Sequence, residues 1–208
     1  MEIQILNVGK GELQSDNIEI IKSTHYDQPK RNYEIWRDCK VDGDEYHDFF
    51  VIPTHNPWID EKILNSEDIK NSIINYTQKE NNIVEVYHIS EKYIVTKFYE
   101  NWYPCIIKSS VNFFGEDKFI ERSDKHFEYF KNINTARKFY KDVISEYRNF
   151  HKETNCFFKD DAANNFIVNE DYSEFKILDF GCLRYDPEKE IRVRQLPDGI
   201  GGINGNDD

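Results

Sequence analysis

Three polar side chains in the last third of the chain have the types and the spacing that phosphoryl transfer needs. Asp160 lies five residues before Asn165, which opens a short apolar segment, and Asp179 ends a second short apolar segment. A carboxylate can orient an attacking hydroxyl group and accept its proton, while an amide oxygen and a second carboxylate are hard ligands of the kind Mg²⁺ prefers. The pattern predicts a site for a magnesium nucleotide, with its side chains held on a hairpin.

These residues carry a resemblance to a known family. Residues 158–160 together with Asn165, followed by the tripeptide at 179–181, resemble the catalytic loop and the Asp-Phe-Gly motif of the protein kinases. The resemblance implies that Asp160 is the catalytic base and that Asn165 and Asp179 hold Mg²⁺. It also implies ATP as the donor and a protein hydroxyl group as the acceptor.

The match departs from the family at two positions of the catalytic loop. Phe158 stands where the kinases have histidine, and an aromatic ring can fill the same packing role. Lys159 stands where they have arginine, and an ammonium group cannot copy the bidentate contact of a guanidinium. The run at 160–165 looks like the tyrosine-kinase version of the loop, except that Asn164 replaces its arginine. The specificity for the acceptor is therefore left open.

The glycines near the N-terminus are weaker candidates for a nucleotide site. Gly9 and Gly11 resemble the start of a glycine-rich phosphate loop, although an ordinary turn explains two glycines equally well. The resemblance further places the hinge along which adenine binds at residues 100–102, so that Glu100 and Trp102 are candidate nucleotide contacts.

The lysine that contacts the phosphates in kinases has no single equivalent here. Lys40 is the first candidate, ahead of Lys22 and Arg37. If the third strand is instead the segment 46–52, that strand carries no lysine. For the acidic partner of this lysine we consider Glu67, for which an N-terminal helix position is an equally good explanation.

Periodicity predicts the elements that position these residues. Alternating β-branched and aromatic residues indicate strands through most of the first hundred residues, and apolar residues three or four apart indicate helices. We expect strands at 4–8, 17–21, 33–36, 46–52, 82–88, 93–99, 166–168 and 175–178, with a further strand near 105–107, and helices at 66–78, 119–130 and 135–151. Strands and helices are segregated, which is typical of an α+β protein.

With the resemblance, this order implies a protein kinase-like fold. We expect an antiparallel-sheet N-lobe at 1–101 and a truncated, mainly helical C-lobe at 102–198 that carries the catalytic-loop hairpin. A flexible tail rich in Gly, Asn and Asp is expected at 199–208.

Composition limits the partners and the compartment. The chain has 208 residues with a formal net charge of −12, which argues against a protein that coats nucleic acid and favours a cation, a protein partner that is itself basic, or a shielded phosphate ligand. No long apolar run or signal peptide is present, and the four cysteines form no paired motif. We therefore expect no membrane association and a cytoplasmic location, in the host cell if the protein comes from a virus or a pathogen.

Two functions from different classes fit these observations. The first is an enzyme, a compact kinase-like phosphotransferase that uses ATP and Mg²⁺. The second is a pseudokinase that binds or inhibits a partner protein, favoured by the missing phosphate-contacting lysine and the short C-lobe. A small-molecule phosphotransferase shares the spacing of Asp160 and Asn165, but Phe180 between Asp179 and Gly181 favours the protein-kinase type.

Overall fold

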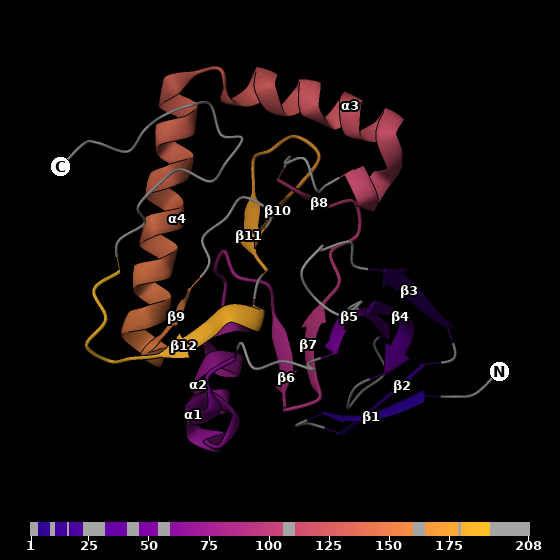
Figure 1. Cartoon of the computed structure of the whole chain (residues 1–208), viewed down its shortest axis with the longest axis vertical. Coiled ribbons are helices and arrows are strands. Elements are labelled where there is room, and N and C mark those ends of the chain that lie inside the picture. Colours follow the sequence, from indigo (N-terminus) through magenta and orange to yellow (C-terminus); the bar gives the residue numbers. More distant parts are fainter. Residues whose placement is uncertain are drawn as a thin grey trace. The chain divides into compact units, whose positions relative to one another are not determined.

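The computed structural model describes residues 4–8, 11–15, 17–22, 32–40, 46–53, 59–105, 111–159, 165–178 and 180–191. The chain divides into two compact units (Figure 1). Unit 1 comprises Met1–Glu80 and Val84–Glu100, and unit 2 comprises Asn81–Ile83 and Asn101–Asp208.

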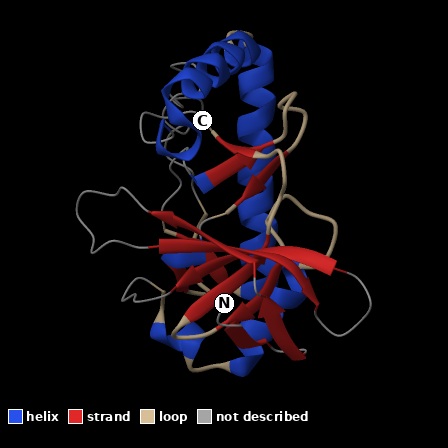
Figure 2. Cartoon of the chain, turned by 90° about the vertical axis from the view of Figure 1, so that its right-hand side faces the viewer, coloured by secondary structure: helices blue, strands red, loops and turns tan. Residues whose placement is uncertain are grey.

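The described residues of unit 1 form a seven-stranded sheet in which every pair of neighbouring strands is antiparallel. Its order is β1-β2-β4-β5-β7-β6, and β3 also pairs with β4. The strands of this sheet are drawn in red in Figure 2. They are β1 (Gln4–Val8), β2 (Gly11–Ser15), β3 (Asn17–Lys22), β4 (Asn32–Lys40), β5 (Tyr46–Pro53), β6 (Val86–Ile89) and β7 (Tyr93–Lys97). The predicted α+β class with an antiparallel sheet is confirmed.

An apolar cluster on this sheet forms the core of unit 1. It joins residues of five strands, because opposite residues of neighbouring strands point to the same face of a sheet. Trp36 of β4, Phe49 of β5 and Val95 of β7 are all at most 1% exposed. Leu6, Leu13, Cys39 and Val51 complete the buried cluster.

Two short helices follow β5, α1 (Glu61–Leu64) and α2 (Glu67–Thr77). The hydroxyl group of Ser66 accepts a hydrogen bond from the N–H of Ile69, which confirms the predicted N-cap. Glu67 is exposed at the first position of α2 and pairs with Lys70 of the same helix, which fits the helix-start explanation. The hydroxyl group of Thr77 accepts from the N–H of Val86 at 3.0 Å and so joins α2 to β6.

His88 of β6 makes the stability of unit 1 depend on pH. Burial, together with the nearby cation of Lys70, lowers the pKa of this imidazole below its usual range, against the weaker opposing effect of Glu67. At pH values below the ordinary histidine pKa of about 6.5, the unfolded chain therefore binds more protons at this residue than the folded chain does. The contribution to stability is therefore present near neutral pH and is lost as the pH falls.

We expect the variant His88→Gln to show a flatter decline of stability than the wild type between about pH 7 and pH 5. Urea unfolding at a series of pH values measures the difference. Parallel stability curves for the two proteins would contradict this assignment.

Unit 2 contains two long helices and short strands. Its elements are β8 (Tyr103–Pro104), α3 (Val111–Phe130), α4 (Ile133–Thr154), β9 (Cys156–Phe158), β10 (Phe166–Val168), β11 (Phe175–Ile177), the 3-10 helix η3 (Phe180–Cys182) and β12 (Leu183–Tyr185). The predicted strand near 105–107 lies instead at Tyr103–Pro104, where it pairs with β10, and residues 106 and 107 are outside the described ranges.

Helix α4 confirms the strongest periodic prediction. Asn132 caps its start, and Asn155 ends it in the left-handed conformation at φ 56°. Of the six residues whose three- and four-residue spacing predicted this helix, four are buried on one face together with Ala136, namely Phe139, Val143, Tyr147 and Phe150, whereas Tyr140 and Ile144 are half-buried.

Two predictions from composition can also be compared with the structure. All four cysteines are free thiols, and those at 39, 105 and 156 are buried. In the part of the chain that the structure describes, every helix is too short or too polar to cross a membrane.

Candidate functional site

The strands that flank the predicted catalytic loop and the Asp-Phe-Gly motif in the sequence form two antiparallel pairs. The outer pair joins β9 to β12, with Phe158 opposite Leu183, and the N–H of Lys159 donates to the carbonyl of Cys182 at 3.0 Å. The inner pair is the β10–β11 hairpin, with Phe166 opposite Ile177. The strand before the catalytic loop is therefore paired with the strand after the Asp-Phe-Gly motif. The strand after the catalytic loop is paired with the strand before that motif.

Asn165 directly precedes β10. It is 6% exposed, and its backbone carbonyl accepts a hydrogen bond of 2.8 Å from the N–H of Leu178. This contact fixes Asn165 beside the residue that immediately precedes position 179. The side chains of Asp160 and Asp179 lie outside the described residues, so their roles stay predictions.

An aromatic cluster connects the described segments that precede and follow the two motifs. The ring of Phe180 is fully buried, and its centroid lies 5.4 Å from that of Phe158 in an edge-to-face arrangement. Phe158 in turn contacts Phe150 and Tyr147 of α4, with centroids 5.1 and 5.4 Å away. The two motif phenylalanines thus connect η3, β9 and α4, and Phe158 has the packing role expected from the sequence.

The segment Asn81–Ile83 belongs to this site, which the sequence did not indicate. The backbone carbonyl of Asn82 accepts a 2.8 Å hydrogen bond from the N–H of Ile177, and Ile83 forms a parallel bridge with Ile177. We had expected residues 82–85 to extend a hairpin strand, but β6 begins only at Val86. The segment's hydrogen bonds go to β11 instead, two residues before Asp179.

Glu146 of α4 holds the same segment. One oxygen of this buried carboxylate accepts from the backbone N–H of Asn82 at 3.1 Å and from its side-chain amide at 3.4 Å. Because Asn82 also contacts β11, the carboxylate positions the strand that leads to Asp179.

We expect Glu146→Ala to lower the free energy of unfolding by about 1–3 kcal/mol, because it leaves a part-buried N–H without its acceptor. Chemical unfolding followed by circular dichroism measures the change. Lys141→Ala, at an exposed position of the same helix, is the control and should change stability by less than about 0.5 kcal/mol. Equal effects of the two substitutions would contradict the anchoring role of Glu146.

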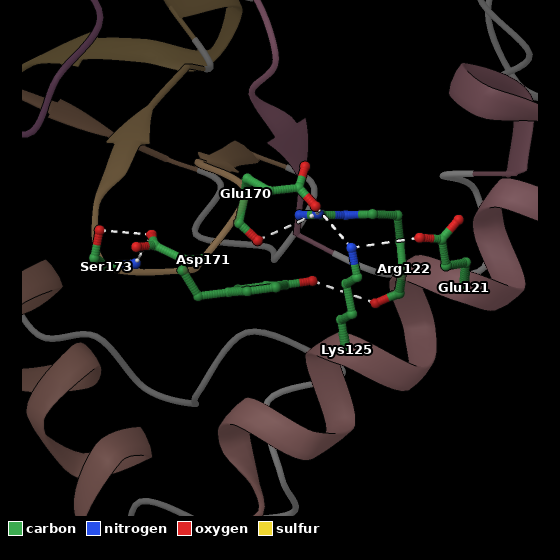
Figure 3. A network of polar contacts seen from close by, with 7 residues as sticks. Glu121, Arg122, Lys125, Glu170, Asp171 and Ser173 are labelled. Atoms are coloured by element: carbon green, nitrogen blue, oxygen red, sulfur yellow. Dashed lines mark hydrogen bonds and ion pairs between the residues drawn. The ribbon is translucent and has the colours of Figure 1, made fainter.

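The turn between β10 and β11 is anchored to α3 by a second polar network (Figure 3). Arg122 is 5% exposed and lies between the rings of Tyr103 and Tyr172, 4.1 and 5.0 Å from their centroids. It donates to the backbone carbonyl of Glu170, whose carboxylate also binds Lys125 at 2.7 Å. These contacts fix the end of the hairpin that lies away from Asn165.

This network also has an electrostatic signature. The hydrogen bond from Lys125 lowers the pKa of the Glu170 carboxyl below its usual range. The sequence carried no signal for Arg122, because an arginine on a helix is normally solvated.

The glycine candidates lie at the first hairpin of unit 1. Val8 is opposite Gly11 in the β1–β2 register, so two residues, Gly9 and Lys10, lie between the strands. Gly9 is outside the described residues and Gly11 opens β2. Two residues between paired strands are typical of a tight hairpin, and the phosphate-loop role of both glycines stays a prediction.

The lysine candidates lie on strands other than β5. Lys40 ends β4, opposite Tyr46 of β5, and Arg37 of β4 is engaged with Asp48 at 2.6 Å and with the ring of Phe98 at 4.4 Å. β5 is the strand that precedes the helices and pairs with β7, and it has no lysine. The phosphate-contacting role of Lys40 stays a prediction, and its place on β4 rather than β5 gives that role no added support.

Sequence analysis also missed a Lys–Glu pair in unit 1. Lys97, at the end of β7 and opposite Phe49, lies 3.1 Å from Glu85, which also accepts from the hydroxyl group of Tyr87. Burial raises the pKa of the neighbouring Tyr99 to about 12. The two residues are 12 apart in the sequence, and Glu85 directly precedes β6, the strand that pairs with β7, so only the strand pairing reveals the contact.

The predicted hinge residues lie at the division between the units. Glu100, the last residue of unit 1, is exposed, whereas Trp102 is half-buried. Asn101 between them adopts the left-handed conformation at φ 60°, which asparagine tolerates better than most residues. Their contact with a nucleotide stays a prediction.

The predicted metal site can be compared with the grouping of ligand-type side chains in the described part of the chain. Among those residues, no three His, Cys, Asp or Glu side chains are grouped closely enough to hold a metal ion. This finding bears neither on Asp160, the predicted base, nor on Asp179, a predicted ligand, because both lie outside the described residues.

Comparison with known proteins gives little beyond this geometry. No family model matches the chain, and no curated protein matches it. Solved structures do match, and one of them is the kinase PK-1 of Cydia pomonella granulovirus, with 13% identity and a TM-score of 0.45. The match covers 81% of this chain and 52% of that kinase, so this chain spans about half of the length of its neighbour.

Proposed function

We propose that the chain is a protein kinase-like phosphotransferase that transfers the γ-phosphate of ATP to a protein hydroxyl group. The observation that carries the proposal is the backbone hydrogen bond between Leu178 and Asn165, together with the pairing of β9 with β12 and of β10 with β11. It supports a site in which Asn165 and Asp179, 14 residues apart in the sequence, act together. The function itself rests on the residue types at 160, 165 and 179.

Each of these side chains has a separate role in the proposal. Asp160 orients the hydroxyl group of the acceptor and takes up its proton. Asn165 and Asp179 hold Mg²⁺, and the fit rests on their amide and carboxylate oxygens, the donor type this ion prefers. When bound, the ion neutralises negative charge on the phosphates. Asn165 is buried and its backbone is hydrogen-bonded, so we expect its side-chain amide to need little reorganisation when the reaction takes place.

We also propose contacts between the nucleotide and residues outside the catalytic loop. We assign Gly9 and Gly11 to the phosphates through their backbone N–H groups, Lys40 to the phosphates through its cation, and Glu100 and Trp102 to the adenine. These assignments rest on the order of elements along the chain, and each can be tested by a single substitution.

A second candidate function is a pseudokinase that binds a partner protein. One observation favours it: β5, which precedes the helices of unit 1, carries no lysine for the phosphates. In that case partner binding survives Asp160→Ala, and ATP and Mg²⁺ are not needed.

A thermal-shift titration with ATP, with and without Mg²⁺, separates the two functions. A ligand at about 100 times its Kd stabilises the native state by about 2.7 kcal/mol, so we expect a clear rise in Tm that depends on Mg²⁺. The rise should be lost in Asp179→Ala and kept in Asp171→Ala, an exposed carboxylate on the turn of the same hairpin. An unchanged Tm at saturating ATP and Mg²⁺ would favour the pseudokinase.

A further inference from the structure

The solvent face of α4 is basic, although the chain as a whole carries a net charge of −12. Lys141, Arg148 and Lys152 are exposed, and their spacing of seven and four residues places them within about 40° of one another around the helix. Exposed Arg137 and Lys138 lie beside this line one turn earlier. We call these five residues the basic stripe.

Helix α4 has three carboxylates, and one of them, Glu153, is exposed about 100° around the helix from Lys152. Glu146 is buried against Asn82, and Asp142 lies about 100° around the helix from Lys141 and pairs with Lys138 at 2.7 Å. Lys141, Arg148 and Lys152 make no ion pair with any residue that the structure describes. By contrast, Lys125 of α3 and Lys131, which directly follows α3, each pair with a glutamate of that helix.

The middle of the basic stripe combines charge with a small apolar surface. Lys141, Ile144, Ser145, Arg148 and Asn149 line a shallow hollow on the helix. Two cations therefore flank a half-buried isoleucine, an arrangement that fits a segment with acidic side chains around one apolar residue.

We propose that the basic stripe is the docking surface for an acidic segment of a partner protein, independent of the phosphotransfer site. From Arg137 to Lys152 the stripe is about 22 Å long, since a helix rises 1.5 Å per residue. An extended peptide of about seven residues covers that length. Charge complementarity sets the chemistry of the segment: glutamate or aspartate on both sides of an apolar residue.

Other polyanions fit the stripe less well. Single-stranded nucleic acid is bound on aromatic platforms, and no aromatic side chain lies in the stripe. A duplex meets the repulsion of the remaining acidic surface beyond one narrow line of cations. A membrane-surface helix exposes its apolar face, whereas the apolar face of α4 is buried in unit 2.

Fluorescence anisotropy with a labelled peptide of two Glu-Glu-Leu-Glu repeats tests the proposal. We expect saturable binding that weakens at least tenfold in the triple variant K141Q/R148Q/K152Q. The control K79Q/K92Q/K118Q removes three exposed cations outside α4 and should stay within about twofold of the wild type. Both variants change exposed side chains, so each is expected to keep the wild-type Tm.

Three outcomes would overturn the proposal. The first is no saturable binding by the wild type, and the second is equal weakening by the two triple variants. The third is displacement of the peptide by a single-stranded oligonucleotide of the same charge that binds more tightly than the peptide, which would assign the stripe to nucleic acid.

Discussion

Phe180→Ala is expected to lower the free energy of unfolding by about 3–5 kcal/mol, the usual effect of deleting a buried phenylalanine ring. The ring is fully buried and packs edge-to-face on Phe158, which continues to Phe150 and Tyr147 of α4. Its loss leaves a cavity at the point where η3 follows Asp179. Urea unfolding followed by circular dichroism measures the change.

Phe127→Ala on α3 is the matched control, because this phenylalanine is 64% exposed. Its removal should change stability by less than about 0.5 kcal/mol. A small effect of Phe180→Ala, comparable with that of the control, would show that the motif phenylalanine does not hold the loop through packing.

The elements that the sequence predicted are those with a repeated pattern. Helix α4 has five buried apolar residues at helical spacing, and β10 and β11 are apolar segments around a polar turn. The Ser66 cap and its acidic first turn identified the start of α2. In each case the signal is local, so neighbouring residues are sufficient to reveal it.

The features that the sequence did not predict depend on contacts between distant residues. β9 and β12 are not joined by a short turn like that between β10 and β11, so only their pairing with each other reveals them. Asn81–Ile83 leaves the expected strand because Glu146, 64 residues later, and Ile177 take its hydrogen bonds. Buried Arg122 is stabilised by two tyrosines and by Glu170, which no local pattern shows.

The candidate site was predicted in part for the same reason. Type and spacing predicted the motif residues, and the described contacts at Asn165, Phe158 and Phe180 join the segments on either side of them, while the roles of Asp160 and Asp179 stay predictions. Lys40 had no such pattern, since a lysine at the end of a strand is most often solvated.

The second large effect is expected at Asp160. Asp160→Asn keeps the size of the side chain and removes the carboxylate that accepts the proton, so phosphoryl transfer should fall by about 10²- to 10⁴-fold. Because the amide still fits the loop, binding of ATP should change little. Asp161→Asn, one residue later, removes the same charge and is the matched control, with activity within about twofold of the wild type.

The transfer of label from the γ-phosphate of ATP to an acceptor protein, or to the chain itself, tests the central claim most directly. The wild type and Asp161→Asn should transfer label in the presence of Mg²⁺, and transfer by Asp160→Asn and Asp179→Ala should be at least about 100-fold slower. Label transfer that is equal in all four proteins, or absent from the wild type at saturating ATP and Mg²⁺, would contradict the proposed phosphotransferase.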